Sequence, residues 1–228
     1  GVQTCALPIL EAIDRLGKEI CLILDDGFQH RALQRDLDIV LIDASNPFGF
    51  GHLLPRGFLR EPLSHLRRAD VVVLTRCDMA EERLLLETQK ALRIFTQAPQ
   101  LKSIHKVAGM RPASTSPEGK WGEGKKLFAF AGIGNPQSFL LSLQKTEAEA
   151  TGHLFYPDHF AYSREDLDHL FRKAKETGAE GLVTTAKDEV KLFGFGPLPL
   201  PVWVLDIQFE MYEGEGVLEE RVRDLFSR

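Results

Sequence analysis

The sequence has 228 residues, 43% of them hydrophobic and 27% charged, which is typical of a globular protein with one large or two small domains. Its formal net charge of -5 argues against non-specific binding to nucleic acid, which requires a basic surface. The cysteines, Cys5, Cys21 and Cys77, are odd in number and form no CxxC pair, so the sequence indicates neither a disulfide framework nor a zinc site and favours a reducing compartment.

The first segment carries no sign of a targeting or membrane-spanning element. Residues 1–9 lack the basic start of a signal peptide. No apolar run in the sequence approaches the roughly 18 residues of a membrane span. The sequence does not begin with Met, so we expect a chain that starts partway through a longer protein. Leu10–Leu16 then predicts the end of a helix that Gly17 closes.

A short apolar run, Ile20–Leu24, leads directly into Asp25-Asp26-Gly27-Phe28-Gln29-His30 and predicts a buried strand. Two successive acids can both leave the core only where a strand ends, because side chains alternate between its faces. In open α/β sheets that end is where ligands bind. Carboxylates suit Mg²⁺, so Asp25 and Asp26 predict a metal site. An ordinary solvated turn is the alternative.

The next elements predict a mostly parallel sheet. Asp38–Ile42 and Asp70–Thr75 are apolar enough for buried strands, and Asp78 is placed to cap a helix that runs to Gln97. Strands separated by helical spans define the α/β class. Between the two strands lies a long loop, Ala44–Pro62, which contains six large apolar residues and is too apolar for a solvated linker.

The same region gathers basic side chains that could hold an anionic substrate. Arginine presents a planar fork that matches phosphate oxygens. A solvated surface loop with ordinary charges is the alternative. The residues concerned are His52, Arg56, Arg60, Glu61, His65, Arg67 and Arg68.

A change in composition over Met110–Lys126 predicts a linker, and therefore a first domain over residues 1–110 and a second, smaller α/β domain over residues 111–228. Asn135-Pro136 and Ser163 predict the starts of two helices, which we expect to end at Gly152 and Gly178. A final helix is expected over 217–226. The predicted strands of the second domain are Leu127–Ala131, Gly181–Thr185 and Val202–Leu205.

Three further motifs follow strands or join elements of the second domain. Tyr156-Pro157-Asp158-His159-Phe160 could supply an acid/base or orienting pair, although a structural histidine is the alternative. Gly132-Ile133-Gly134-Asn135-Pro136 could present amides to an anion, a weak signal because it is not a complete GxGxxG. Lys187 could bind phosphate or form a plain salt bridge. No GxxxxGK[ST] phosphate loop occurs in the sequence.

Taken together, the motifs resemble the tetraacyldisaccharide 4′-kinases, the lipid A 4′-kinases of Gram-negative bacteria. The resemblance runs from about Leu10 to the C-terminus, and it depends on the joint order and spacing of short motifs. These are Leu24–His30, Arg35–Asp38, Leu54–Glu61, Ala131–Pro136, Pro157–Phe160 and Thr185–Asp188.

The resemblance implies a two-domain P-loop kinase fold that moves the γ-phosphoryl group of ATP to the 4′-hydroxyl of a lipid-linked disaccharide 1-phosphate, giving lipid IVA. It also implies Mg²⁺ as cofactor and a peripheral location at the cytoplasmic face of the bacterial inner membrane. No nucleic acid is expected as a partner.

Residue roles follow from the same resemblance. Asp25 and Asp26 match the Walker B acids, with Asp26 as the expected Mg²⁺ ligand, and His159 matches the histidine that assists the catalytic aspartate of the family. At the substrate side the resemblance places Gln29, His30, Arg60 and Glu61. Lys187 is the expected cofactor-binding cation.

The sequence departs from the family at its start. The family's N-terminal part carries an apolar membrane-associating helix, the Walker A loop and the catalytic aspartate, and none of these occurs here. We therefore expect the isolated chain to be inactive or impaired and to bind ATP poorly. A non-catalytic α/β module that binds a phosphorylated ligand or a partner chain is the alternative. An aspartyl-phosphate phosphatase is disfavoured, because the DxDxT order is missing.

Overall fold

The computed structural model describes residues 20–116 and 125–227. The chain divides into two units: unit 1 contains the described residues up to Ile104 together with those from Met211 onward, and unit 2 contains His105–Glu210. Strands β3 (Gln100–Pro112) and β7 (Val202–Glu213) belong to both units and are neighbours in the strand order.

This division differs from the predicted domain boundary after residue 110. It lies earlier in the chain, and the C-terminal residues group with unit 1. The predicted linker was wrong for Met110–Pro112, which continue strand β3. Two sequence-based predictions fall outside the described residues, namely the helix over Leu10–Leu16 and the part of the linker over 117–124.

The sheet of unit 1 consists of parallel strands, as the sequence predicted. Strand β1 (Ile39–Asp43) pairs with β2 (Val71–Thr75), and β2 pairs with the start of β3. All of β2 is buried, which fits a central strand of a parallel sheet that is covered on both faces. Both predicted strands are confirmed to within one residue.

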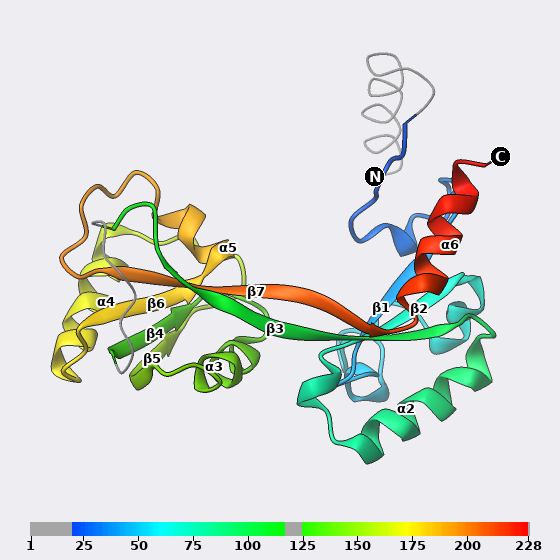
Figure 1. Ribbon diagram of the computed structural model, residues 1–228, viewed down its shortest axis with the longest axis horizontal. Helices are drawn as coiled ribbons and strands as arrows, with labels where there is room; N and C mark the ends of the chain where they lie inside the picture. The colour runs from blue at the N-terminus through cyan, green and yellow to red at the C-terminus, as the bar shows by residue number, and fades with distance from the viewer. Residues whose placement is uncertain (1–19, 117–124, 228) are drawn as a thin grey trace. The chain divides into compact units, whose positions relative to one another are not determined.

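Helix α2 (Glu82–Phe95) covers one face of this sheet (Figure 1). Its Leu92 is completely buried in a cluster with Leu74 of β2. The helix is shorter than predicted, because Cys77–Met79 forms a separate 3₁₀ turn and the residue before the helix is Glu81 rather than Asp78.

Helix α6 (Glu215–Leu225) confirms the predicted C-terminal helix and lies on the other face of the unit 1 sheet, where Leu218 packs against Val73. Gly214 precedes it with φ +88°. A Cβ atom there would lie 2.4 Å from Leu101 Cδ2. The positive φ, together with this close approach, favours glycine where the chain turns from β7 into α6.

The predicted strand over Ile20–Leu24 was wrong. Within the described residues this segment pairs with no strand, and β1 pairs only with β2. Leu22 is 42% exposed and Ile23 is 91% exposed, so the run is not buried either. A strand needs a neighbour for its backbone groups, and an apolar run alone does not provide one.

Unit 2 contains a second set of parallel strands in the order β7-β6-β4-β5. Strands β4 (Lys126–Ala131) and β6 (Gly181–Thr185) match the prediction, and β7 extends the predicted strand well beyond Leu205. Strand β5 (Glu149–Phe155) was missed. It is an edge strand of mixed polarity, so its sequence gives no continuous apolar run.

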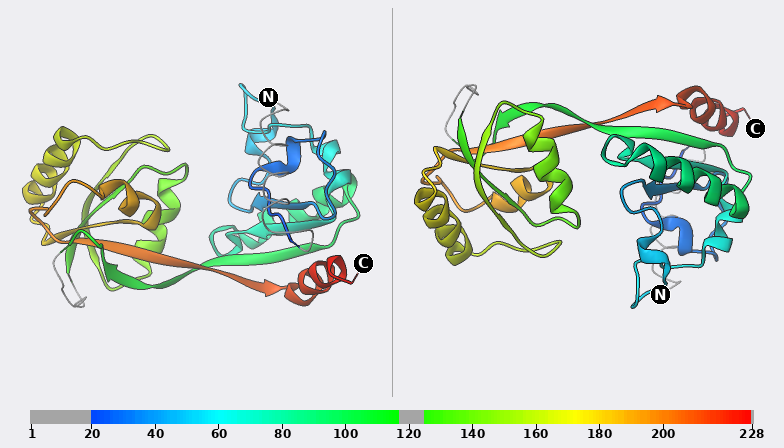
Figure 2. Two further views of the ribbon diagram at one scale, coloured as in Figure 1. Left: turned by 90° about the horizontal axis from the view of Figure 1, so that it is seen from above. Right: turned by 90° about the horizontal axis from the view of Figure 1, so that it is seen from below.

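Two helices pack on opposite faces of the unit 2 sheet (Figure 2). Helix α3 (Pro136–Gln144) begins as predicted, with the Asn135 side chain accepting the Ser138 amide at 3.2 Å, but it ends before Gly152. Helix α4 (Arg164–Glu176) has the predicted capping box of Ser163 and Asp166.

The remaining helical segments are short. Helix α5 (Ala186–Glu189) follows β6 directly, and the 3₁₀ turn Val190–Leu192 follows α5. Three 3₁₀ turns lie in unit 1 besides Cys77–Met79; they cover Gly27–Gln29, Gly49–Gly51 and Leu63–Arg68. None of the helices in the described parts of the chain combines the length and the apolar character needed to cross a membrane.

Candidate functional site

The turn that carries the predicted metal ligands lies in unit 1 and is exposed. Asp26 has a left-handed backbone (φ 53°) and immediately precedes the 3₁₀ turn Gly27–Gln29. The side chains of Asp25, Gln29 and His30 are also exposed. Arg60 donates a hydrogen bond to the Asp26 carboxylate. The structure therefore brings Asp26 and Arg60 together, although these two residues are 34 positions apart in the sequence.

Glu61, the next residue, is the centre of a partly buried ion-pair network. Its side chain is 18% exposed and accepts a hydrogen bond from Arg68, while His65 Nδ1 lies 3.1 Å from Glu61 Oε2. Arg68 also donates to the Phe28 carbonyl at 3.2 Å and lies 4.2 Å above the Phe28 ring. Glu61 and Arg68 therefore fasten the segment 60–68 to the turn that carries Asp26.

Arg35 holds the other end of the turn. It donates to the His30 carbonyl at 2.6 Å and to the two Asp38 carboxylate oxygens at 2.6 and 3.1 Å. The hydrogen bond to Asp38 raises the pKa of Arg35. Because Asp38 immediately precedes β1, this fork ties the exposed turn to the sheet.

A folded loop over residues 48–59, which we call the tip loop, carries apolar side chains into solvent. Phe50 is 69% exposed and Phe58 is 67% exposed, and their ring centroids are 5.3 Å apart. Backbone hydrogen bonds cross the loop, from the Phe58 amide to the Gly49 carbonyl at 2.9 Å and from the Leu59 amide to the His52 carbonyl at 3.1 Å. A Cβ atom at Gly57 would lie 2.3 Å from the His52 carbonyl oxygen, so this crossing requires glycine.

In unit 2, three loops that the sequence singled out separately meet at one edge of the sheet. Strands β4, β5 and β6 run parallel and therefore end on the same side, which we call the rim of unit 2. The Tyr156 amide donates to the Ala131 carbonyl at 2.9 Å, which joins the ends of β5 and β4. A Cβ atom at Gly134 would lie 3.2 Å from Asp158 Oδ2, so the glycine loop lies directly against the histidine loop.

His159 projects from the rim into solvent. Its side chain is 93% exposed, and its backbone is left-handed with φ 59°. Its amide donates to Asp158 Oδ1 at 3.0 Å, and Nε2 lies 3.7 Å from Asp158 Oδ2. Lys187 is exposed as well and has no ion-pair partner among the described residues.

Sequence reasoning missed the residue that joins these loops, Asp188. Its side chain is fully buried and accepts hydrogen bonds from four groups. The donors are the Gly132 amide at 3.1 Å, the Tyr162 hydroxyl at 3.1 Å, the Thr185 hydroxyl at 2.9 Å and Lys191 Nζ at 2.8 Å. The sequence feature that could have indicated Asp188 is its position three residues after Thr185 at the start of a helix, which resembles a capping box.

The neighbouring acid, Glu189, makes a different set of contacts. Arg111 donates to its two carboxylate oxygens at 2.9 and 2.6 Å, and the Ser114 amide and hydroxyl donate at 2.8 and 3.1 Å. The hydrogen bonds from Arg111, with smaller contributions from Ser114, lower the pKa of Glu189 to about 2. Glu189 thus ties helix α5 to strand β3.

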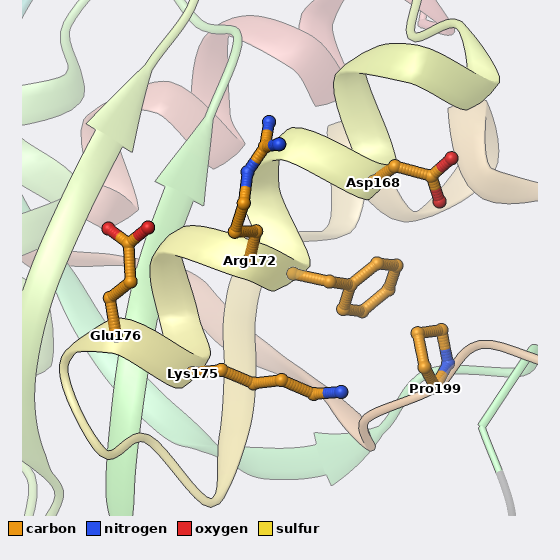
Figure 3. Close-up of a pocket in the computed structure, with 6 residues that line it drawn as sticks. Asp168, Arg172, Lys175, Glu176 and Pro199 are labelled. Atoms are coloured by element: carbon orange, nitrogen blue, oxygen red, sulfur yellow. The ribbon is translucent and has the colours of Figure 1, made fainter.

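One pocket, of about 560 Å³, lies on helix α4 and contains none of the predicted site residues (Figure 3). Its lining comes from the second half of α4 and from Pro199. This end of the helix leads into the start of β6, so the pocket lies at the opposite end of the strands from the rim. The lining residues are Asp168, Phe171, Arg172, Lys175, Glu176 and Pro199.

A mostly parallel α/β sheet whose polar loops gather at the carboxyl ends of its strands is the architecture of proteins that bind ligands at that rim. Residues 9–227 match the family described as tetraacyldisaccharide-1-P 4′-kinase. The chain belongs to this family.

Individual relatives agree with the family match. The chain is 41% identical to the tetraacyldisaccharide 4′-kinase of Syntrophus aciditrophicus over 88% of its own length and 56% of that protein. It is 39% identical to the enzyme of the same name from Anaeromyxobacter sp. strain Fw109-5, over 95% of the chain and 58% of the relative. The chain thus spans little more than half the length of these curated relatives.

A solved structure shares the fold. It is that of LpxK from Aquifex aeolicus, the "apo" form in complex with ATP, and it is 29% identical to this chain. The TM-score is 0.64, and the match covers 95% of this chain and 61% of that one. The comparison supports the predicted fold class, an α/β fold with a mostly parallel sheet.

The contacts of Glu189 predict a specific pH dependence of stability. Its pKa is about 2 in the folded chain and 4.5 in a solvated reference, so its carboxylate stabilises the fold above about pH 4.5 and this contribution is lost as the pH falls toward 2. The difference corresponds to about 3 kcal/mol. Urea unfolding of wild type and Glu189→Gln between pH 7 and pH 2.5 should show the two free energies of unfolding converging at low pH.

Glu176→Gln is the matched control, because Glu176 is an exposed acid paired with a lysine and should change little. A constant difference between wild type and Glu189→Gln across the whole pH range would contradict the assignment.

Proposed function

We propose that this chain carries the metal-side and substrate-side residues of an ATP-dependent kinase that phosphorylates the 4′-hydroxyl of tetraacyldisaccharide 1-phosphate, giving lipid IVA. The observation that carries the proposal is the pairing of Asp26 with Arg60, which joins the predicted metal ligand to the predicted substrate-side segment. In this proposal unit 1 contributes to the P-loop kinase core and unit 2 is the second α/β domain. The Aquifex aeolicus relative was solved with ATP, which supports ATP as the phosphoryl donor.

The donor set of the exposed turn fits Mg²⁺. This ion is held in kinases by one or two carboxylates and keeps its other positions for water and phosphate oxygens. Asp25 and Asp26 offer two exposed carboxylates, and no group of three or more metal-binding side chains gathers among the described residues, which a closed metal cage would require. Mg²⁺ bound by Asp25 and Asp26 would neutralise charge on the phosphates of the nucleotide.

Arg60 and Glu61 have complementary parts in the proposal. Arg60 is more than half exposed, so its guanidinium can exchange its contact with Asp26 for a phosphate oxygen of the substrate. Glu61 is held by Arg68 and His65 and fixes the backbone from which Arg60 projects. Gln29 and His30 are exposed on the same turn as Asp26 and complete the proposed substrate side.

Unit 2 supplies an imidazole and a cation. When the 4′-hydroxyl attacks the γ-phosphorus, a new P–O bond forms, the bond to the ADP oxygen breaks, and the hydroxyl proton must leave. We assign His159 to the orientation of the group that accepts this proton, because its imidazole is 93% exposed and can both donate and accept a hydrogen bond. Lys187, exposed on the same rim, is assigned to the phosphates of the nucleotide.

The tip loop supports a lipid-linked substrate and a peripheral location at a membrane, which we propose to be the cytoplasmic face of the inner membrane, as the resemblance implies. Phe50, Leu53, Leu54 and Phe58 are each at least 44% exposed, and Arg56 and Arg60 lie in or beside the same loop. Aromatic side chains next to arginine suit the boundary between acyl chains and anionic headgroups. A folded loop gains nothing from exposing such groups to water alone.

A second function is favoured by one observation. The 228 residues contain no GxxxxGK[ST] loop, so the chain on its own lacks the usual cradle for nucleotide phosphates. A non-catalytic module that binds a phosphorylated ligand or a partner chain would fit this absence. A chimera that places the N-terminal part of the Syntrophus aciditrophicus relative before this chain separates the two functions. Phosphoryl transfer by this chimera would support the kinase, and its absence would support the non-catalytic module.

The first prediction from this proposal concerns Asp26. In that chimera, Asp26→Asn should lower the rate of 4′-phosphorylation at least about a hundredfold, because a charge that stabilises the transition state is lost. Stability should stay within about 0.5 kcal/mol, since the Asp26 side chain is 61% exposed. The assay is transfer of labelled phosphate from ATP to tetraacyldisaccharide 1-phosphate.

Glu87→Gln serves as the control for Asp26→Asn, because Glu87 is another exposed acid of unit 1 that pairs with an arginine. Turnover of Asp26→Asn close to that of Glu87→Gln would remove the metal-ligand assignment.

The second prediction concerns the tip loop. Replacing both Phe50 and Phe58 with Ser should weaken binding to anionic phospholipid vesicles more than tenfold, because burying one such side chain contributes about 1.5–3 kcal/mol. Co-sedimentation with the vesicles measures the effect. Ile94→Ser is the control, since Ile94 is an apolar residue of α2 that is 78% exposed. An equal loss of binding in the control and the double variant would refute the lipid assignment.

A further inference from the structure

We propose that Asp188 is a positioning residue, whose buried carboxylate fixes the conformation of the loop over residues 156–162 that presents His159. The statement about loop conformation stands on the contacts within unit 2. Its consequence for phosphoryl transfer depends on the function proposed above.

The first step is the direct link from Asp188 to this loop. Tyr162 is 7% exposed, and its hydroxyl donates to Asp188 Oδ1 at 3.1 Å. Lys191 Nζ donates to the same oxygen at 2.8 Å and supplies the countercharge that a buried carboxylate requires. Burial, together with the nearby charge of Asp188, raises the pKa of Tyr162, so its hydroxyl remains a donor at all physiological pH values.

The second step runs from Tyr162 to the two sides of the His159 turn. The rings of Tyr156 and Phe160 stack with centroids 4.6 Å apart, and Pro157-Asp158-His159 lies between them in the sequence. The Tyr162 ring meets both of them edge-on, at 5.1 and 5.5 Å. A fixed Tyr162 therefore fixes both aromatic residues that close the turn.

The third step is a backbone contact with the end of β4. Asp188 Oδ2 accepts the Gly132 amide at 3.1 Å. A Cβ atom at Gly132 would lie 3.3 Å from Asp188 Oδ1, from the Phe160 Cβ and from the Pro157 carbonyl oxygen. The Gly132 backbone is thus packed between the Asp188 carboxylate and the histidine loop. The Asp188 side chain therefore sets the spacing between the end of β4, helix α5 and the histidine loop.

His159 needs such support because its backbone is strained. A φ of 59° is uncommon for any residue other than glycine, and such a conformation persists only where the surroundings determine it. Locally the turn has two hydrogen bonds, from the Phe160 amide to the Pro157 carbonyl at 3.1 Å and from the His159 amide to Asp158. The aromatic cluster held by Asp188 supplies the remaining constraint.

Glu189 serves as the control for Asp188, because it is a buried acid that would be expected to stabilise unit 2 without contacting the histidine loop. Glu189 is the next residue on the same helix, is 5% exposed and is also fully hydrogen-bonded. Its partners, Arg111 and Ser114, lie outside the histidine loop. Loss of either acid should destabilise unit 2, but only loss of Asp188 should release the loop.

The test is amide hydrogen exchange of the 228-residue chain, followed by NMR. The readout is the exchange rate of the Phe160 amide, which closes the His159 turn, divided by that of the Val183 amide in the buried strand β6. We expect this ratio to rise more than tenfold in Asp188→Asn and in Tyr162→Phe. It should not rise in Glu189→Gln, because general destabilisation of unit 2 speeds exchange of the Val183 amide at least as much as that of the Phe160 amide. Tyr162→Phe loses only the hydroxyl, so it tests the proposal even where Asp188→Asn does not fold.

An unchanged ratio in Tyr162→Phe, or an equal rise in Glu189→Gln, would overturn the proposal. The chimera described above supplies the functional readout. There, Tyr162→Phe should lower kcat with little change in the KM for ATP, whereas Glu189→Gln should leave kcat unchanged. If no version transfers phosphate, the proposed function fails while the exchange result still decides the role of Asp188 in the loop.

Discussion

Parallel pairing of β4, β5 and β6 is the constraint on which the candidate site of unit 2 depends. Because the strands run the same way, the loops that follow them emerge at one edge. Loops that are far apart in the sequence then compete for the same space, and their backbone groups must find partners there. The Asp188 carboxylate meets this need for the Gly132 amide, and it also accepts hydrogen bonds from the side-chain hydroxyls of Tyr162 and Thr185 in the other two segments.

Unit 1 achieves the same end with ion pairs, one of them exposed and two of them partly buried. Its exposed turn is held by arginines that contact neighbouring segments, namely Arg35 at Asp38, Arg60 at Asp26 and Arg68 at Glu61. Such pairs contribute little to stability when they are solvated, but they fix the relative placement of loops that have no core of their own. The residues assigned to chemistry are exposed in both units, whereas Asp188 and Glu61 are more buried and hold the backbone near them.

Much of the fold could be predicted from the sequence, because its strands and helix starts have local causes. Val71–Leu74 is a continuous apolar run and is buried, and the side chains of Asn135 and Ser163 cap helices where expected. The failures depended on long-range pairing. Ile20–Leu24 has a strand-like sequence but pairs with no strand among the described residues, and β5 is a strand without a strand-like sequence.

The residues of the candidate site also fall into those that local sequence motifs indicate and those that depend on long-range contacts. Asp26, Arg60 and His159 could be predicted as candidates because their motifs have a recognisable order, and their roles stay predictions. Asp188 was present in one of those motifs, yet its role was not predictable, since its partners Gly132 and Tyr162 are 56 and 26 positions away. A buried carboxylate is recognised only when the groups around it are known.

The central proposal is that the acids of the Asp26 turn and the imidazole of His159 take part in the same phosphoryl transfer. A double-mutant cycle on kcat tests it most directly. The cycle compares Asp26→Asn, His159→Ala and the double variant in a chimera that supplies the N-terminal part of a relative. The account predicts that each single change slows transfer strongly and that the double variant is slowed much less than the product of the two effects. Wild-type kcat in His159→Ala would contradict it.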